Sequence, residues 1–264
     1  MQRSHSSLDD GAMWTGKAII QPGWAIFFGT AGDHVPHRHH AVQLVVGLTG
    51  TVGLWSEKSG ELEGAGAVIA ADHAHRLTGG RDPLLLAYVN RETDLGRQLD
   101  AWCGAGARAL SAGQAEHLRG LLRQPECVTA QTLKRVVAII LDSAAASGTP
   151  PFHDPRIAQL LATLPRPLPE RISTSELAAR VSLSPGRFGH LFRAHTGMPL
   201  RPYLRWLRLQ QALASVAQGY RLTEAAHAAG FADSAHLSRS FRRTFGIPPQ
   251  VLLNPAFSLK TGLE

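Results

Sequence analysis

The feature that most constrains this chain is a pattern that occurs twice in its C-terminal part, over residues 173–199 and again over 222–248. The matched positions are 48 residues apart early in the pattern and 49 residues apart later, so one residue has been gained inside the second copy. The positions that match are Glu176 with Glu224, Phe192 with Phe241, and the closing glycine, apolar residue and proline at 197–199 with those at 246–248. The sequence therefore predicts one structural unit built twice.

Each copy carries the signals of two short helices joined by a tight turn. Ser173 and Glu176 form a capping box, and Ser184 places a capping hydroxyl before Pro185 at the first helical position. The apolar residues of the second helix fall on one face in each copy: Phe188, Leu191 and Phe192, then Leu237, Phe241 and Phe245. The other face carries arginine and histidine, as in a helix that enters the major groove of DNA. One copy alone would equally suit an ordinary helical hairpin, and the repeat favours a helix-turn-helix.

The distribution of charge supports this interpretation. The chain has a formal net charge of +7, and residues 152–264 hold 14 basic and 6 acidic side chains. Residues 1–151 hold 13 basic and 14 acidic ones, so they are close to neutral. The positive charge therefore collects where the repeat lies, as the neutralisation of DNA phosphates requires.

Residues 154–253 closely resemble the DNA-binding domain of the AraC/XylS family of transcriptional regulators. The most specific part of the match is Ala226-x-x-x-Gly230-Phe231, followed by Phe241-Arg242-Arg243-x-Phe245-Gly246-Ile247-Pro248-Pro249. The resemblance implies an all-α domain of two helix-turn-helix units joined by a long helix, which we expect at 202–218. It also implies double-stranded DNA as the partner, with RNA polymerase as a further candidate.

The resemblance also carries the family's base-reading positions onto this chain: Gly186, Gly189 and His190 in the first recognition helix, and Ser234, Ala235, Ser238 and Arg239 in the second. With neighbouring basic and polar side chains, the predicted DNA-binding set is Gly186, Arg187, His190, Arg193, Ser234, Ala235, His236, Ser238, Arg239 and Arg242. Glycine has no side chain that can reach a base, whereas arginine can form a bidentate contact with guanine. We therefore expect the second unit to discriminate sequence more strongly than the first.

The N-terminal part has a different pattern, in which short apolar runs alternate with glycine-rich turns between Ala18 and Val89. The runs are Ala25–Phe28, Val42–Val46, Thr51–Trp55, Ala67–Ala70 and Leu84–Val89. Many short strands at close spacing are typical of an antiparallel sandwich or a small barrel.

Six of the 13 histidines lie in this segment: His34, His37, His39, His40, His73 and His75. The stretches 37–50 and 66–75 resemble the two motifs of cupins, jelly-roll barrels that hold a metal with histidines from both motifs and a carboxylate from the first. The resemblance implies an effector site lined by His37, His39, Gln43 and His75. Since side chains alternate along a strand, His37 and His39 are expected on the same side, facing the barrel interior.

Two departures from the cupin motifs affect what this site can hold. Gln43 stands at the carboxylate position, and Asp72 stands where cupins usually have glycine. A neutral amide is a weaker ligand for a divalent cation than a carboxylate. The cupin domains of AraC-type regulators mostly bind small organic effectors without metal, so we expect no resident cofactor. Three interpretations of the histidines remain open: the lining of an effector pocket, a divalent metal site, or a structural role alone.

Residues 93–147 show helical spacing, most clearly in the apolar stripe of Leu133, Val136, Val137, Ile140 and Leu141. Such a stripe packs either against the barrel or against a second copy in a homodimer. The segment 148–151, Gly-Thr-Pro-Pro, breaks the helix and predicts a linker. We thus predict an α+β multidomain chain: a cupin-like jelly roll with following helices at 1–150, which binds an effector and dimerises, and the all-α DNA-binding domain at 151–264.

The remaining features exclude other classes of protein. The two cysteines, Cys103 and Cys127, have no CxxC spacing, so neither a disulfide framework nor a zinc finger is indicated. We expect a cytoplasmic protein without membrane contact, because no apolar segment is long enough for a span. The predicted function is a non-enzymatic, ligand-responsive transcriptional regulator. The alternative is a metal-sensing regulator, or a metal-dependent cupin enzyme fused to a DNA-binding domain.

Overall fold

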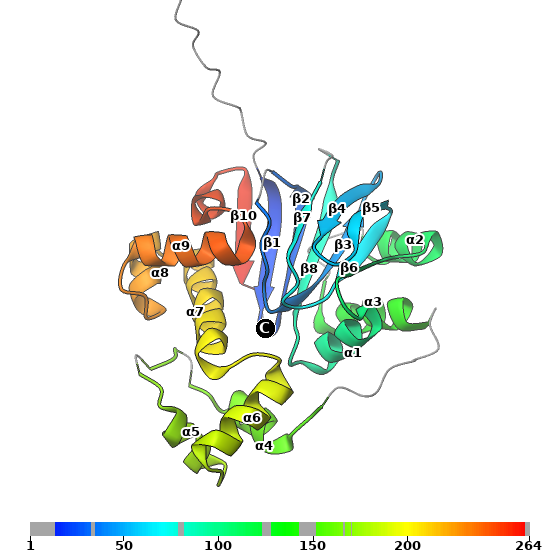
Figure 1. Ribbon diagram of the computed structural model, residues 1–264. Helices are drawn as coiled ribbons and strands as arrows, with labels where there is room; N and C mark the ends of the chain where they lie inside the picture. The colour runs from blue at the N-terminus through cyan, green and yellow to red at the C-terminus, as the bar shows by residue number, and fades with distance from the viewer. Residues whose placement is uncertain are drawn as a thin grey trace, which may run out of the picture.

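The computed structural model describes residues 14–32, 35–78, 82–122, 128–142, 152–165, 167–169 and 171–261 (Figure 1). His34, Cys127 and the predicted linker at 148–151 lie outside these residues. The chain builds an N-terminal domain rich in β-strands and a C-terminal helical domain, as the sequence predicts. Among the described helices, none combines the length and the apolar character that crossing a bilayer requires.

The N-terminal domain is built from two sheets. The larger has the strand order β10-β1-β2-β8-β3-β6-β9, and the smaller has the order β5-β4-β7. The strands are β1 (Thr15–Gln21), β2 (Trp24–Thr30), β3 (Ala41–Gly47), β4 (Val52–Ser56), β5 (Gly60–Gly64), β6 (Gly66–Ile69), β7 (His75–Leu77), β8 (Leu84–Asn90), β9 (Ala107–Ala109) and β10 (Phe257–Thr261). The pairs formed by β1 to β9 are antiparallel, which fits the predicted cupin-like jelly roll.

Three helices cover one face of the large sheet: α1 (Asp94–Cys103), α2 (Ala112–Leu121) and α3 (Ala130–Asp142) (Figure 1). The even-numbered residues of β3, from Val42 to Val46, share a core cluster with these helices, whereas Val45 belongs to the cluster on the opposite face. The predicted stripe of α3 is also in this core, since Leu133 and Ile140 are 1% and 0% exposed. Its buried side chains are therefore used within one copy of the chain.

The C-terminal domain contains the two predicted helix-turn-helix units. The first consists of α5 (Thr174–Arg180) and α6 (Pro185–Thr196), and the second of α8 (Leu222–Ala228) and α9 (Ser234–Phe245). The joining helix α7 runs over Leu200–Ala217 and begins two residues before the expected start. A short helix, α4 (Pro155–Ala162), packs against α6.

The turns of the two units repeat at the level of backbone conformation. Ser182 and Gly230 occupy matching positions, with φ angles of 54° and 74° in the left-handed region. A residue other than glycine costs roughly 1–2 kcal/mol in that conformation, so the first unit tolerates strain that the second avoids. The capping box of Ser173 and Glu176 is present as predicted. The repeated pattern is thus one backbone path followed twice.

The C-terminal tail returns to the N-terminal domain, an arrangement for which the sequence offered no signal. Strand β10 pairs in parallel with β1 at the edge of the large sheet, with Phe257 opposite Gly16 (Figure 1). The ring of Phe257 stacks on that of Phe27, with 5.6 Å between the centroids. One hydrophobic cluster therefore contains both residues of the sheets and residues of α7, α8 and α9. The second helix-turn-helix and the barrel share a core.

A buried polar network joins the N-terminal domain to α7. His40 Nδ1 lies 3.1 Å from Asp72 Oδ2, and His40 Nε2 lies 3.4 Å from Glu92 Oε2. Burial alone would lower the pKa of His40, but the hydrogen bond to Asp72 and the close contact with the Glu92 carboxylate outweigh it and raise the pKa to about 9. On the other side, Tyr203 of α7 donates its hydroxyl to Glu92 Oε1 at 2.9 Å. The buried ion pair of His40 and Glu92 therefore receives a hydrogen bond from a side chain of the DNA-binding domain.

The returning tail makes a first prediction. Replacing Phe257 with alanine should lower the free energy of unfolding by about 3 kcal/mol, because a buried ring that stacks on Phe27 is removed. Denaturant unfolding of the full-length chain measures the change. Ser258→Ala is the control: Ser258 is exposed on the same strand, so the expected change is below about 0.5 kcal/mol. Equal midpoints for Phe257→Ala and wild type would show that the tail does not hold the domains.

Candidate functional site

The first recognition helix, α6, separates an apolar face from a basic one. Phe188 and Phe192 are fully buried and Leu191 is 5% exposed. The predicted DNA-binding residues lie on the other face, where Gly186, Arg187, His190 and Arg193 are all exposed. These four residues can therefore be reached by DNA, whereas Gly189 is half-buried.

The second recognition helix, α9, has the same division: the predicted residues Ala235, His236, Arg239 and Arg242 are exposed, and so is the neighbouring Arg243. The two serines of the predicted set are half-buried, and the Ser238 hydroxyl donates to the backbone oxygen of Ser234 at 2.7 Å. Because that hydroxyl already has a backbone partner, Ser238 is less available to a base than Arg239.

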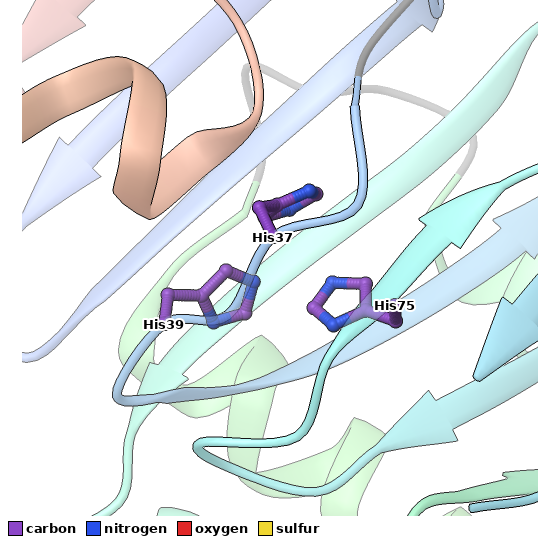
Figure 2. A group of neighbouring side chains, drawn as sticks. All are labelled: His37, His39 and His75. Atoms are coloured by element: carbon purple, nitrogen blue, oxygen red, sulfur yellow. The ribbon is translucent and has the colours of Figure 1, made fainter. Parts of the chain in front are cut away.

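The histidine cluster is brought together as the sequence predicts. Ligand atoms of His37, His39 and His75 all lie within 4.8 Å of one another, and the three side chains are buried. Figure 2 shows the three rings converging. The prediction that His37 and His39 lie on a regular strand is wrong, because β3 begins only at Ala41 and His37 forms an isolated bridge with His75.

The hydrogen bonds of two of these rings define their tautomers. Nδ1 of His39 lies 2.9 Å from the carbonyl oxygen of Ala41, and Nδ1 of His75 lies 2.9 Å from that of His73. A carbonyl oxygen only accepts, so Nδ1 is the donor in both rings. Burial lowers the pKa of His39, although hydrogen bonds to Gln43 and Ala41 oppose the shift. In the neutral ring, Nε2 then carries the lone pair.

Gln43 lies between the two lone pairs. Its amide is 2.9 Å from Nε2 of His39 and 3.0 Å from Nε2 of His75, with Oε1 placed toward both. Two neutral rings each need a hydrogen-bond donor at this position. The Gln43 amide provides it when it is turned over, so that its NH2 group takes the place of Oε1 and donates one hydrogen to each ring. Gln43 can thereby satisfy both histidines without a metal. With a divalent ion, the same rings would be ligands oriented by their backbone carbonyls, but the set would contain no carboxylate.

The departure at Asp72 has a structural reason. Asp72 has a φ angle of 63°, the left-handed conformation that glycine adopts without strain. Aspartate tolerates this conformation better than most residues. Its backbone N–H donates to the oxygen of His39 at 2.8 Å, and its carboxylate lies against His40. Asp72 therefore links the histidine segment to the buried network that reaches α7.

The cluster also touches the second helix-turn-helix directly. The backbone N–H of Val35 donates to the oxygen of Gly246, the residue that caps α9, at 3.1 Å. A Cβ at position 246 would lie 2.6 Å from Nδ1 of His37. The ring of His39 lies 6.3 Å from that of Phe245. Any change in this segment thus bears on the end of the second recognition helix.

A cavity opens beside the cluster, between the large sheet and the second helix-turn-helix. It encloses about 980 Å³ of empty space, part of it open to solvent. His37 and Gln43 are among its lining residues, which come from both domains. The sequence did not indicate the others, such as Tyr88 and Trp206, because they come together only when α7 packs on the sheet. Burial raises the pKa of Tyr88, so its phenol remains a neutral donor.

Sequence comparisons with known proteins match the C-terminal helical domain. A family model described as a helix-turn-helix domain matches residues 177–254. The HTH-type transcriptional activator RhaS of Pectobacterium carotovorum is 37% identical over 103 residues, which are 39% of this chain and 37% of that protein. The C-terminal part of this chain is thus similar to helix-turn-helix transcriptional regulators. The match to RhaS thus spans little more than a third of that relative's length.

The fold of most of the chain is shared with a solved structure. ToxT from Vibrio cholerae O395 has a TM-score of 0.57 at 9% identity and covers 88% of this chain and 98% of its own. A structure described as ToxT with an unsaturated fatty acid bound has a TM-score of 0.53 at 8% identity, covering 97% of this chain and 99% of its own. At such identities the similarity establishes the fold, an N-terminal sheet-rich domain and a C-terminal helix-turn-helix domain.

The amide of Gln43 makes the second prediction. Gln43→Glu should raise the affinity for Zn²⁺ by at least about tenfold over wild type, because a carboxylate joins three imidazoles that already converge. Zinc titration against a chromophoric chelator, on protein made without a histidine tag, measures this change. The double variant Gln43→Glu with His75→Ala is the control and should lose the gain. Equal zinc affinity of wild type and Gln43→Glu would show that the three converging histidines do not form a metal site.

Proposed function

We propose that this chain is a sequence-specific, DNA-binding transcriptional regulator of the AraC type that responds to a small-molecule effector. The repeated helix-turn-helix with two outward basic faces carries the proposal. The family model and the activator RhaS support it, since both match the same part of the chain. In this proposal the chain has no catalytic activity and acts on DNA in the cytoplasm.

The joining helix sets how the two units meet DNA. α7 has 18 residues, which corresponds to a length of about 27 Å. Two recognition helices held about this far apart fit successive major-groove segments on one side of the duplex, about one helical turn from each other. Phosphate contacts from Arg193 and Arg242 would position the protein without selecting a sequence.

The effector is proposed to act from the N-terminal domain, near His37, His39, Gln43 and His75. This cluster borders the cavity between the domains and touches the cap of α9. The fatty acid described for ToxT supports a small organic effector in a protein of this fold. A homodimer and a contact with RNA polymerase also remain proposals. A dimer interface on α3 would have to use its exposed face, because the apolar stripe is buried in the core.

A metal-sensing regulator is the second candidate, and the convergence of three buried histidines favours it. An enzymatic cupin would need the same metal. The two candidates differ in metal content: wild-type protein purified without a histidine tag should retain far less than one equivalent of metal if the effector is organic. One equivalent of zinc, iron or manganese after dialysis would favour the metal-based alternatives.

The DNA-reading residues make the third prediction. We expect the Arg239→Ala variant to discriminate less well at one guanine of an operator that wild-type protein selects from a random DNA pool. The loss should be about 1–3 kcal/mol, because the bidentate contact is lost. His190→Ala should have a smaller effect at the first half-site. Arg193→Ala and Arg242→Ala should weaken binding evenly across sequences, since they act on phosphates. Fluorescence anisotropy with single-base operator variants measures all four.

If the selection yields no preferred DNA sequence, the proposed function is wrong. If the first half-site tolerates base changes less than the second, the function stands but our ranking of the two units is reversed. Binding that stays equally strong from low to high salt would also contradict the phosphate contacts, because counterion release makes such binding depend strongly on salt.

The glycines of α6 make the fourth prediction. A Cβ at Gly186 or Gly189 would meet no atom within 4 Å, so packing within the described residues does not require glycine there. Glycine costs about 1 kcal/mol relative to alanine inside a helix. We expect Gly189→Ala to raise the free energy of unfolding by about that amount and to weaken DNA binding, because the bare backbone lets the helix approach the duplex closely.

Gly120→Ala is the matched control for this prediction. Gly120 lies on α2, where an added Cβ also meets no atom of the described residues within 4 Å. It should give a similar gain in stability and unchanged DNA affinity. DNA affinity of Gly189→Ala equal to that of the control would mean that the glycine does not serve close approach.

A further inference from the structure

The cavity between the domains has walls of two origins. Trp24 and Phe27 come from β2 of the large sheet, whereas Trp206 of α7 and Phe241 and Phe245 of α9 come from the DNA-binding domain. Leu259 of the returning tail closes a further side. The lining is thus mainly aromatic and aliphatic, as in sites that bury most of a small apolar ligand.

The polar groups of this cavity are neutral amides and rings. Gln21, Gln43, Asn90 and Gln210 contribute carboxamides, and Tyr88 and His37 add a phenol and an imidazole. Among the described residues that line the cavity, there is no lysine, arginine, aspartate or glutamate. The nearby arginines Arg38, Arg205 and Arg243 line a separate opening, which shares His37 and Trp206 with this cavity.

One donor in the lining has no partner within the part of the chain that the structure describes. The indole Nε1 of Trp206 is buried and makes no hydrogen bond to any described residue, and Trp206 is 6% exposed overall. A buried N–H without an acceptor costs roughly 1–3 kcal/mol. A carbonyl or hydroxyl oxygen on a ligand would satisfy it once the indole turns its N–H toward the cavity.

We propose that this cavity is the effector site and that it takes an uncharged, mainly apolar small molecule carrying a hydrogen-bond acceptor. The proposal rests on the proposed function and names the chemical class of its effector. A carboxylate buried here would lose its hydration without gaining a cationic partner, which is strongly unfavourable. A neutral amide or alcohol loses much less and finds amide and indole donors in the walls.

The position of the cavity also connects the ligand to DNA reading. Trp206 and Leu213 lie on the helix that joins the two units, and Phe241 and Phe245 lie on the second recognition helix. A molecule held between these residues and the sheet alters how α7 and α9 pack on the barrel. The effector thereby acts most directly on the second unit, which shares its core with the sheet.

A matched pair of probes tests the chemical class. The full-length protein is titrated without DNA, with 4-phenylbutanamide and separately with 4-phenylbutanoate, at about pH 8, where an ordinary imidazole is neutral. Tryptophan fluorescence reports binding, because Trp14, Trp24 and Trp206 line the cavity. We expect saturable binding of the amide at least about tenfold tighter than that of the carboxylate. Equal or tighter binding of the carboxylate, or no saturable binding of the amide, would overturn the proposal.

A charge placed in the cavity should reverse this preference. Leu213→Lys introduces a cation on α7 inside the lining, so the variant should bind 4-phenylbutanoate more tightly than the amide. Gln218→Lys adds the same charge to the end of α7, outside this cavity, and should keep the wild-type preference. If Leu213→Lys fails to fold by circular dichroism, Gln210→Lys serves in its place. A wild-type preference in the folded variant would place the binding site elsewhere.

Ligand binding and DNA binding are measured separately on the same protein. Loss of the amide preference with intact, sequence-specific DNA binding would overturn only the inference about the effector. Saturable amide binding in a protein that selects no DNA sequence would instead overturn the proposed function.

Discussion

The burial of His40 with Glu92 sets the relation between the two domains. Removing an imidazolium and a carboxylate from water is costly, and the cost is offset only when both charges keep partners. Asp72 and Glu92 supply them for His40, and Tyr203 of α7 supplies a hydroxyl for Glu92. Nearby, Gln210 of α7 donates to Asn90 at 3.0 Å. These contacts hold α7, the helix that joins the two DNA-reading units, against the buried ion pair of the N-terminal domain.

This constraint makes the two units unequal. The second unit shares a hydrophobic core with the sheets and is covered by the returning strand β10. The first unit lies in a different cluster, in which Phe188 and Phe192 pack with α4 and the start of α7, and to which the barrel contributes Ala41 of β3. A signal that arises in the barrel reaches α9 through this large shared core, whereas it reaches α6 through a smaller contact, in which Tyr203 lies between His40 and Phe192. The unit that carries Arg239 is thus also the unit most exposed to control by the effector.

The helical part of the chain could be predicted closely because its signals are local. A capping box at Ser173, a proline after Ser184 and apolar stripes of period 3.6 each act within a few residues. The histidines could be assigned to one site because their motifs resemble a known family. β10 and the cavity could not be predicted, since their residues meet only through contacts between segments far apart in sequence. Trp206 looks like any core residue of a helix until the sheet lies opposite.

The departures from the cupin pattern are connected through hydrogen bonding. Gln43 replaces a charged ligand with a neutral amide that can donate to two imidazoles, so the cluster can be satisfied by protein groups alone. Asp72 replaces a glycine at a left-handed position and gains a contact with His40. The negative charge that a metal site would place at residue 43 is thus absent, and one stands at residue 72 instead. There it stabilises the charged network that holds α7, so the changed motif serves contact between the domains.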